Sequence, residues 1–279
     1  MKRLSMLLLM LFLLVFGLQG PAQAAVPTTQ LTWYGQSAFK LVTPMGHVLF
    51  IDPWILNPVN QQGKDDLAKI DRADLILVSH GHFDHVGQAV EIAKKTKARL
   101  VATLDLGGAI ARYGGYPKDQ MGFDTLGNFG GVLELLDGEV KIAFVPAIHS
   151  STVNGKELGV NEDDESHFAG APGGFVITIK GGPTIYHTGD TDLFTDMSLI
   201  AKYGKIDWML ACIGDHFTMG PALAAEAVSL VKPVKVVPMH YGTFLPVMTG
   251  TPDKFARALE AKGLGQKFMP MTVGKPVTF

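Results

Sequence analysis

The stretch SHGHFDHVG, residues Ser79–Gly87, places three histidines and one aspartate within six consecutive positions of a chain that has nine histidines in 279 residues. It follows the apolar run Leu75–Val78, which has the length and composition of a buried strand. Because side chains alternate in direction along an extended segment, His80 and His82 point to the same side. Two imidazoles on one side of a strand end form half of a metal site.

Asp84 and His85 fall where the chain must turn into the next helix, so the turn can aim them at a second point close to the first. Four ligand side chains within six positions are difficult to satisfy with one tetrahedral ion, but they suit two adjacent ions. Imidazole and carboxylate ligands without a thiolate favour zinc, with manganese or iron as the alternatives. The sequence therefore predicts a centre of two divalent metal ions.

The other ligands of such a centre should lie at the ends of other strands. His149 ends the run IAFVPAIH, Asp190 follows the strand TIYH, and His240 ends VKVVPMH. Loops that follow neighbouring strands converge on one edge of a sheet, so these side chains are expected near the first four. A lone histidine at a strand end is more often structural, but three such positions beside a compact H-x-H-x-D-H element favour one shared site.

The order of apolar patterns predicts the fold. Short strands at 31–34, 37–42 and 47–51 indicate a β-meander, and beyond it strands alternate with helical patterns. The expected class is α/β, with two mixed sheets face to face and helices outside, and no linker or repeat divides residues 25–279, which favours one domain. Further strands are expected at 75–78, 100–103, 132–136, 140–145, 175–179, 184–187, 208–213 and 234–239, and helices at 86–93, 106–113, 192–203, 222–231 and 253–262.

The chain begins MKRLSMLLLMLFLLVFGLQGPAQAA, in which two basic residues precede an apolar run and small residues follow it. This pattern is typical of a secretory signal peptide over residues 1–24, with cleavage near Ala24 and Ala25. The apolar run is well short of the roughly 20 residues that a membrane-spanning helix needs, so a permanent membrane span is not expected. The protein is therefore expected to be exported, either to the periplasm or out of the cell.

The net charge and the cysteine content limit the classes of partner that the sequence favours. Without Lys2 and Arg3, 22 basic residues face 26 acidic ones, a formal charge of −4, so nothing favours nucleic acid as a partner. The single cysteine, Cys212, cannot form an internal disulfide, and its apolar surroundings favour inert packing. A small-molecule or lipid-like substrate is expected instead, and the apolar stretches DPWILNPV and GTFLPVM suit either an acyl chain or the core.

Four further polar residues near the strand ends each have a functional and a structural interpretation. Asp52 either orients a ligand imidazole or lies in a surface turn before Pro53. His187 either donates a hydrogen bond near a ligand or packs at a strand end, and His216 either acts on the substrate or is structural. His167 lies in the long acidic loop NEDDESHFAGAPGG, which either borders a site or is solvated and flexible.

The segments SHGHFDHVG, AIHSS, TIYHTGDTDLF, IGDHFTMGP and PMHYGTF together resemble the metallo-β-lactamase superfamily. More narrowly, they resemble its small metal-dependent hydrolases, a branch that includes relatives of ascorbate-phosphate lactonase and N-acyl-phosphatidylethanolamine phospholipase D. The resemblance implies an αββα sandwich, in agreement with the order of elements. Two other relatives differ, because flavodiiron oxidoreductases carry Glu in place of His82 and penicillin-degrading members usually carry Cys in place of Asp190.

The resemblance implies a hydrolase that cleaves an ester-type bond, such as a phosphodiester or a lactone, with a hydroxide that bridges two metal ions. Asp84 is a candidate to accept or orient the proton of the water, and His216 to protonate the leaving group. Ser150 and Ser151 follow a ligand, but no general base serves them, so a serine nucleophile is not expected. The implied ligands are His80, His82 and His149 for the first ion, Asp84, His85 and His240 for the second, and Asp190 as the bridge.

A non-catalytic protein that binds zinc through an inherited site is the alternative function. Against it, Asp84 and Asp190 are both present, and simple capture of a metal does not need this water-activating arrangement. A nuclease of the same superfamily is disfavoured by the net negative charge and the lack of a basic stripe in the sequence.

Overall fold

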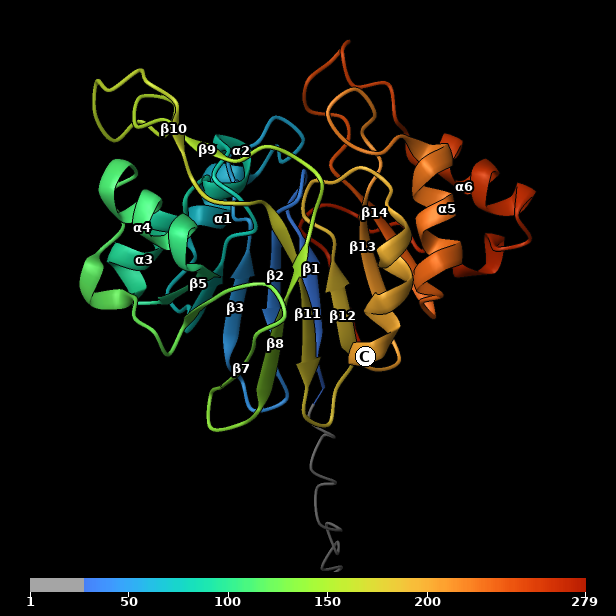
Figure 1. The fold of residues 1–279 in the computed structure, drawn as a ribbon, viewed down its shortest axis with the longest axis horizontal. Helices are drawn as coiled ribbons and strands as arrows, with labels where there is room; N and C mark the ends of the chain where they lie inside the picture. The colour runs from blue at the N-terminus through green and yellow to red at the C-terminus, as the bar shows by residue number, and fades with distance from the viewer. Residues whose placement is uncertain (1–27) are drawn as a thin grey trace, which may run out of the picture.

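The computed structural model describes residues 28–279, so the predicted signal peptide at 1–24 lies outside the described residues. Two β-sheets pack face to face, and helices cover the outer face of each, which gives the four layers of an αββα sandwich (Figure 1). The α/β architecture expected from the sequence is therefore confirmed. Within residues 28–279, no helix is both long enough and apolar enough to cross a bilayer.

The first sheet has seven strands, in the order β15 (Pro276–Thr278), β1 (Gln30–Trp33), β2 (Phe39–Val42), β3 (Val48–Ile51), β4 (Leu75–Leu77), β5 (Arg99–Thr103) and β6 (Leu126–Gly127). β1, β2 and β3 form the predicted antiparallel meander, and β4, β5 and β6 continue the sheet in parallel. β15 was not predicted, and it pairs antiparallel with β1.

The second sheet has six strands, in the order β14 (Lys235–Met239), β13 (Trp208–Cys212), β12 (Thr184–His187), β11 (Gly173–Ile179), β8 (Val140–Pro146) and β7 (Val132–Leu135). β12, β13 and β14 run parallel, whereas β7–β8 and β11–β12 are the two predicted hairpins. A separate two-stranded sheet, β9 (Thr152–Val153) with β10 (His167–Phe168), closes the connection 154–166, which contains the acidic part of the long loop.

The helices are α1 (Gly63–Ala68), α2 (Phe83–Val86), α3 (Ala89–Thr96) and α4 (Leu104–Tyr113) beside the first sheet, and α5 (Pro221–Val231) and α6 (Pro252–Ala261) beside the second (Figure 1). The helix predicted at 86–93 is divided at Gly87, whose φ is +42° and whose missing Cβ would lie 2.4 Å from the Trp54 backbone. The helix predicted at 192–203 is a 3₁₀ helix, Thr195–Tyr203. α1 was missed because only Gly63 in it is buried, so it carries no apolar stripe.

The central strands of the first sheet, β3 and β4, are buried on both faces. Leu49 and Leu77 pack in the cluster between the two sheets, whereas Phe50 and Ile76 pack in the cluster beneath α3 and α4. Because alternate residues enter different layers, these strands are apolar throughout, and polar residues occur at their ends. The strand ends are therefore where functional side chains can be placed without disturbing the core.

Candidate functional site: two adjacent metal-ligand groups

All seven predicted ligands lie at one edge of the sandwich, the upper edge in Figure 1, where α2, β9 and β10 are drawn. They come from both sheets, because they follow β4, β8, β12 and β14 or lie in α2. The ligand atoms form two groups, within each of which all of them are less than 4.8 Å apart: His80, His82 and His149 in the first group, and Asp84, His85, Asp190 and His240 in the second.

The first group consists of three imidazoles that face one another. Nε2 of His80 lies 3.0 Å from Nδ1 of His82, and the ring centre of His149 lies 5.1 Å from both other rings. β9 packs directly on this turn, since a Cβ at Gly81 would come within 2.7 Å of the Thr152 carbonyl oxygen. His80 is buried, whereas His82 and His149 are partly exposed, so this group faces the solvent side.

The second group is buried and contains two carboxylates. Nε2 of His240 lies 2.8 Å from Oδ2 of Asp190, and Nε2 of His85 lies 3.2 Å from Oδ1 of the same residue. Asp84 is close to the same two rings, at 3.4 Å from His240 and 3.6 Å from His85. Asp190 also lies 3.7 Å from Nε2 of His149, which places it between the two groups.

Asp52 orients imidazoles in both groups. It accepts hydrogen bonds from Nδ1 of His85 at 2.8 Å and from the Ser79 hydroxyl at 2.6 Å. Because the Ser79 hydroxyl donates to Asp52, its oxygen is left to accept from Nδ1 of His80, 3.0 Å away. Both rings therefore keep the lone pair of Nε2 for a metal ion, and the surface-turn interpretation of this fully buried aspartate is wrong.

Gln36 holds the other carboxylate and was not found from the sequence. Its Nε2 donates to Oδ2 of Asp84 at 2.8 Å, its Oε1 accepts from the Thr243 hydroxyl at 2.6 Å, and its carbonyl accepts from the His240 N–H at 3.0 Å. Gln36, Asp52 and His240 all have φ values near +50°, at +47°, +45° and +56°. Non-glycine residues rarely adopt this conformation, and residues held in it cluster at functional sites.

The arrangement leaves buried polar atoms without partners among the described residues. Nε2 of His85, Oδ1 of Asp190 and Nε2 of His240 are buried and make no hydrogen bond of acceptable geometry there. Such atoms are costly unless something else satisfies them. All three are nitrogen or oxygen atoms that can donate a lone pair to a metal ion, and they converge on one point. The residues of the second group therefore fit a divalent metal ion, and the first group forms an adjacent all-histidine site.

The two groups differ in protonation. Burial holds the pKa of His80 well below its usual value, and burial together with His149 lowers the pKa of His82 to about 4. In the second group burial also opposes the imidazolium form, but Asp190 and Asp84 outweigh it, raising the pKa of His240 to about 9 and that of His85 well above its usual value. Without a metal, protons therefore neutralise the second group.

Other candidates near the edge support the ligands. His187 is buried, and because it accepts from the Gly189 N–H at Nδ1, its Nε2 must donate to the Ser37 carbonyl, 3.1 Å away. It thereby fixes the loop that carries Asp190. Ser151 accepts from the Gly81 N–H and donates to the backbone, so its role is structural.

The remaining predicted residues lie farther out. His216 is exposed in a turn after β13, where its ring packs edge-on against Phe217 at 4.5 Å. His167 pairs with Asp163 at 2.8 Å and stacks on Tyr113 at 3.7 Å, so it anchors the acidic loop. Cys212 is buried, and burial raises its pKa to about 11, which agrees with inert packing.

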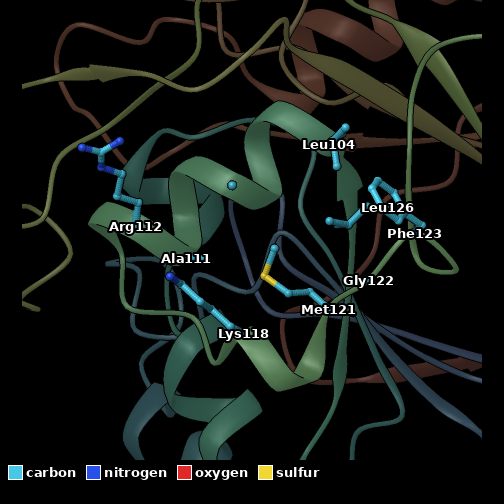
Figure 2. Close-up of a pocket in the computed structure, with 9 residues that line it drawn as sticks. Leu104, Ala111, Arg112, Lys118, Met121, Gly122, Phe123 and Leu126 are labelled. Atoms are coloured by element: carbon cyan, nitrogen blue, oxygen red, sulfur yellow. The ribbon is translucent and has the colours of Figure 1, made fainter.

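A pocket of about 400 Å³ opens directly onto both ligand groups. Its floor is formed by His82, Asp84, His149, Asp190 and His240. A larger cavity, of about 620 Å³, lies between α4 and residues 118–126 and is shown in Figure 2. Its lining holds none of the seven ligands and no acidic or histidine side chain, so the smaller pocket is the candidate active site.

A family model described as the Beta-lactamase superfamily domain matches residues 47–241, a range that contains all seven ligands. The chain belongs to the metallo-β-lactamase superfamily. A UPF0173 metal-dependent hydrolase of Thermodesulfovibrio yellowstonii is 50% identical over 278 residues, 99% of each chain. One of Anaeromyxobacter dehalogenans is 51% identical over 259 residues, 92% of this chain and 89% of the relative.

The solved structure of Igni18, a metallo hydrolase of Ignicoccus hospitalis, has a TM-score of 0.75 and 34% identity, covering 90% of this chain and 98% of that one. The fold, the ligand groups and these relatives agree. The protein is a metal-dependent hydrolase of the metallo-β-lactamase superfamily.

Proposed function

We propose that the protein is an exported hydrolase that uses two divalent metal ions, zinc before manganese or iron, to cleave an ester-type bond such as a phosphodiester or lactone. The observation that carries the proposal is Asp190, which lies between an all-histidine group and a carboxylate-rich group at the floor of one pocket. His80, His82 and His149 would hold one ion, and Asp84, His85 and His240 the other, with Asp190 shared.

When bound, two such ions lower the pKa of a water molecule toward about 7 and polarise the oxygen of the bond to be cleaved. The oxygen of the water then bonds to the carbonyl carbon or phosphorus, and the bond to the leaving oxygen breaks. The proton lost by the water ends on the leaving group. The products are an acid and an alcohol, so the reaction needs no oxidant or reductant.

The chain supplies groups that handle this proton. Asp84 lines the pocket, and Gln36 holds its Oδ2, so the other carboxylate oxygen is the one assigned to accept the proton. His216 is the candidate donor to the leaving group: it does not itself line the pocket, but its ring packs against Phe217, which does. The assignment of Asp84 follows the general requirement that a base lie within reach of the proton it accepts.

The test combines metal analysis of the purified protein with a panel of phosphodiesters, lactones, thioesters and β-lactams. We expect two ions per chain, and we expect His82→Ala and Asp190→Ala each to lower turnover at least about a thousandfold, because metal ions contribute several kcal/mol to such reactions. His47→Ala is the matched control, since this histidine pairs with Glu139 in the turn between β2 and β3 and should leave turnover unchanged. Metal-loaded protein that cleaves nothing would favour the non-catalytic alternative.

Export rests on residues 1–24 and needs a separate experiment. Full-length protein produced with a carboxyl-terminal tag is expected in the periplasm or medium, with a mass that corresponds to a chain beginning near Ala25. A cytosolic protein that retains Met1 would overturn this part of the proposal and leave the hydrolase assignment intact.

A further inference from the structure

Four aromatic side chains stand beside the metal ligands but belong to neither hydrophobic core. Trp54 follows β3, Phe83 begins α2, Phe217 follows β13 and Phe244 follows β14. None of the four packs in the cluster between the sheets or in the one beneath α3 and α4. The core interpretation of the stretches DPWILNPV and GTFLPVM therefore does not explain Trp54 and Phe244.

These four residues form one continuous aromatic wall. Trp54 stacks on Phe244 with ring centres 5.8 Å apart and a 16° angle, and Phe83 meets both edge-on at 5.5 and 6.1 Å. Phe217 extends the wall at 6.2 Å from Phe244, and half of its surface is exposed. Phe83, Phe217 and Phe244 line the pocket. Trp54, Phe83 and Phe244 are partly exposed, so a group of aromatic rings that belongs to neither core borders solvent at one place, which is typical of a binding site.

The part of the pocket lining that comes from residues 150–166 is polar. Ser150, Thr152, Glu157 and Ser166 form it, and Ser150 Oγ lies 3.4 Å from Nε2 of His82. Within residues 28–279 no ion pair includes Glu157. The neighbouring Lys156 pairs instead with Asp164, at 2.6 Å. No lysine or arginine of the described chain lines this pocket. The polar side therefore offers hydrogen-bond acceptors and a negative charge, and it has no cation with which to hold an anion.

From these two sides we infer the substrate class of the proposed hydrolase: an ester-type compound with an aromatic or short acyl group on one side of the scissile bond and an uncharged or cationic group on the other. The inference rests on the proposed function for the reaction itself. The Glu157 carboxylate disfavours a substrate with an additional anionic group. A pocket of about 400 Å³ is near the lower end of the range of about 300–1,000 Å³ for small-molecule sites, which favours one such group over a long chain.

The experiment compares matched esters on the zinc-loaded protein. Phenylacetylcholine carries the aromatic group and a cation, the phenylacetyl ester of glycolic acid carries the same group and an anion, and acetylcholine lacks the aromatic group. We expect kcat/KM for phenylacetylcholine to exceed that of each of the other two by at least about tenfold. The phenethyl ether of choline cannot be hydrolysed, and it should bind the zinc-loaded protein in calorimetry. Its binding should also quench tryptophan fluorescence, and the quenching should be smaller in Trp54→Phe than in the native protein.

Variants test each side of the pocket. Glu157→Lys should reverse the preference between the choline and glycolate esters, whereas Glu162→Lys, in the same β9–β10 connection but outside the lining, should preserve it. Phe244→Ala should weaken binding of the ether about tenfold and lower kcat/KM for phenylacetylcholine by a larger factor than kcat/KM for acetylcholine. Phe123→Ala is its control, because Phe123 is an exposed aromatic residue of the remote cavity (Figure 2).

The outcomes separate this inference from the proposed function. Equal kcat/KM for the choline and glycolate esters, or a preference that Glu157→Lys does not move, would overturn the substrate class while metal-dependent hydrolysis stands. If no ester or other panel substrate is cleaved but the ether binds and responds to Phe244→Ala and Glu157→Lys, the pocket assignment survives and the hydrolase proposal fails.

Discussion

The two ends of the sandwich carry similar polar residues in opposite states. At the lower end in Figure 1, Glu139 lies between the β2–β3 and β7–β8 turns and accepts from the Thr43 hydroxyl at 2.7 Å, the Met45 N–H at 2.8 Å and His47 at 2.6 Å. At the upper end, Asp190 is equally buried, but its Oδ1 makes no hydrogen bond among the described residues. Neighbouring protein groups satisfy the Glu139 carboxylate, whereas Oδ1 of Asp190 has no hydrogen-bond partner among residues 28–279 and suits a bound ligand.

Backbone conformation follows the same division. Gln36, Asp52 and His240 have positive φ and all contact the upper site, whereas the lower end has positive φ at Leu136 and Asp137, which form the β7–β8 turn. Positive φ in a tight hairpin is the turn's own requirement. At the upper end Gln36 also lies in a tight turn, between β1 and β2, where the Ala38 N–H donates to the Gly35 carbonyl. Asp52 and His240 follow strands that enter no hairpin at this end, so their strain is a cost of placing ligands. The difference indicates that the lower end stabilises the fold and the upper end is built for chemistry.

The largest expected effect concerns pH and separates the two ligand groups. His240, with its pKa raised to about 9, and His85, also raised, must lose protons before a metal ion binds, so affinity of the second group should rise with pH until about 9, by about tenfold per unit for each proton displaced. The first group should show no such slope above about pH 5, because the pKa of His82 is lowered to about 4.

Zinc titrations between pH 6 and 9 would measure this contrast in two variants. His82→Ala keeps the second group and should show the steep dependence, whereas His85→Ala keeps the first group and should be flat. If zinc affinity changes equally with pH in the two variants, the two ligand groups do not differ in protonation as proposed.

A smaller effect is expected for Asp52→Asn, which tests whether Asp52 sets the imidazole tautomers. The amide keeps the size of the side chain but presents an N–H group to His85 or Ser79, so one ligand nitrogen loses its orientation. Loss of such a supporting partner costs about 10- to 100-fold in metal affinity or activity. Zinc affinity at fixed pH measures the loss, and Asp74→Asn, at an ion pair with Arg72 before β4, is the control. Unchanged affinity in Asp52→Asn would assign this carboxylate to folding alone.

The ligand positions could be predicted because each is a local event: a polar residue directly after an apolar run. His149, Asp190 and His240 carry that signal, and parallel strands bring their ends to one edge. Gln36 carries no such signal, since its partners Asp84 and Thr243 lie 48 and 207 residues away and its φ is positive without glycine. Asp52 kept two interpretations because an aspartate before a proline has the same local pattern in a surface turn.

The aromatic wall could be predicted only in part. Apolar composition is the same for a core segment and for a substrate pocket, so the sequence around Trp54 and Phe244 could not separate them. Ile55, next to Trp54, is indeed core, and Met248 is buried as well. Only the three-dimensional contacts distinguish neighbours that point into the core from neighbours that point into the pocket.

The smallest predicted effect lies at the lower end, where Glu139→Gln should reduce stability without changing turnover. Burial raises the pKa of Glu139, but the hydrogen bonds from His47, Thr43 and Met45 outweigh burial and hold the pKa below its usual value. A group with a lowered pKa contributes stability above its unfolded pKa and loses it as pH falls through its folded pKa. The variant should therefore be about 1–3 kcal/mol less stable in urea unfolding at pH 7, with the difference shrinking as the pH falls below about 4. A loss of turnover in Glu139→Gln at full stability would show that the lower end also serves the chemistry, and the division between the two ends would not hold.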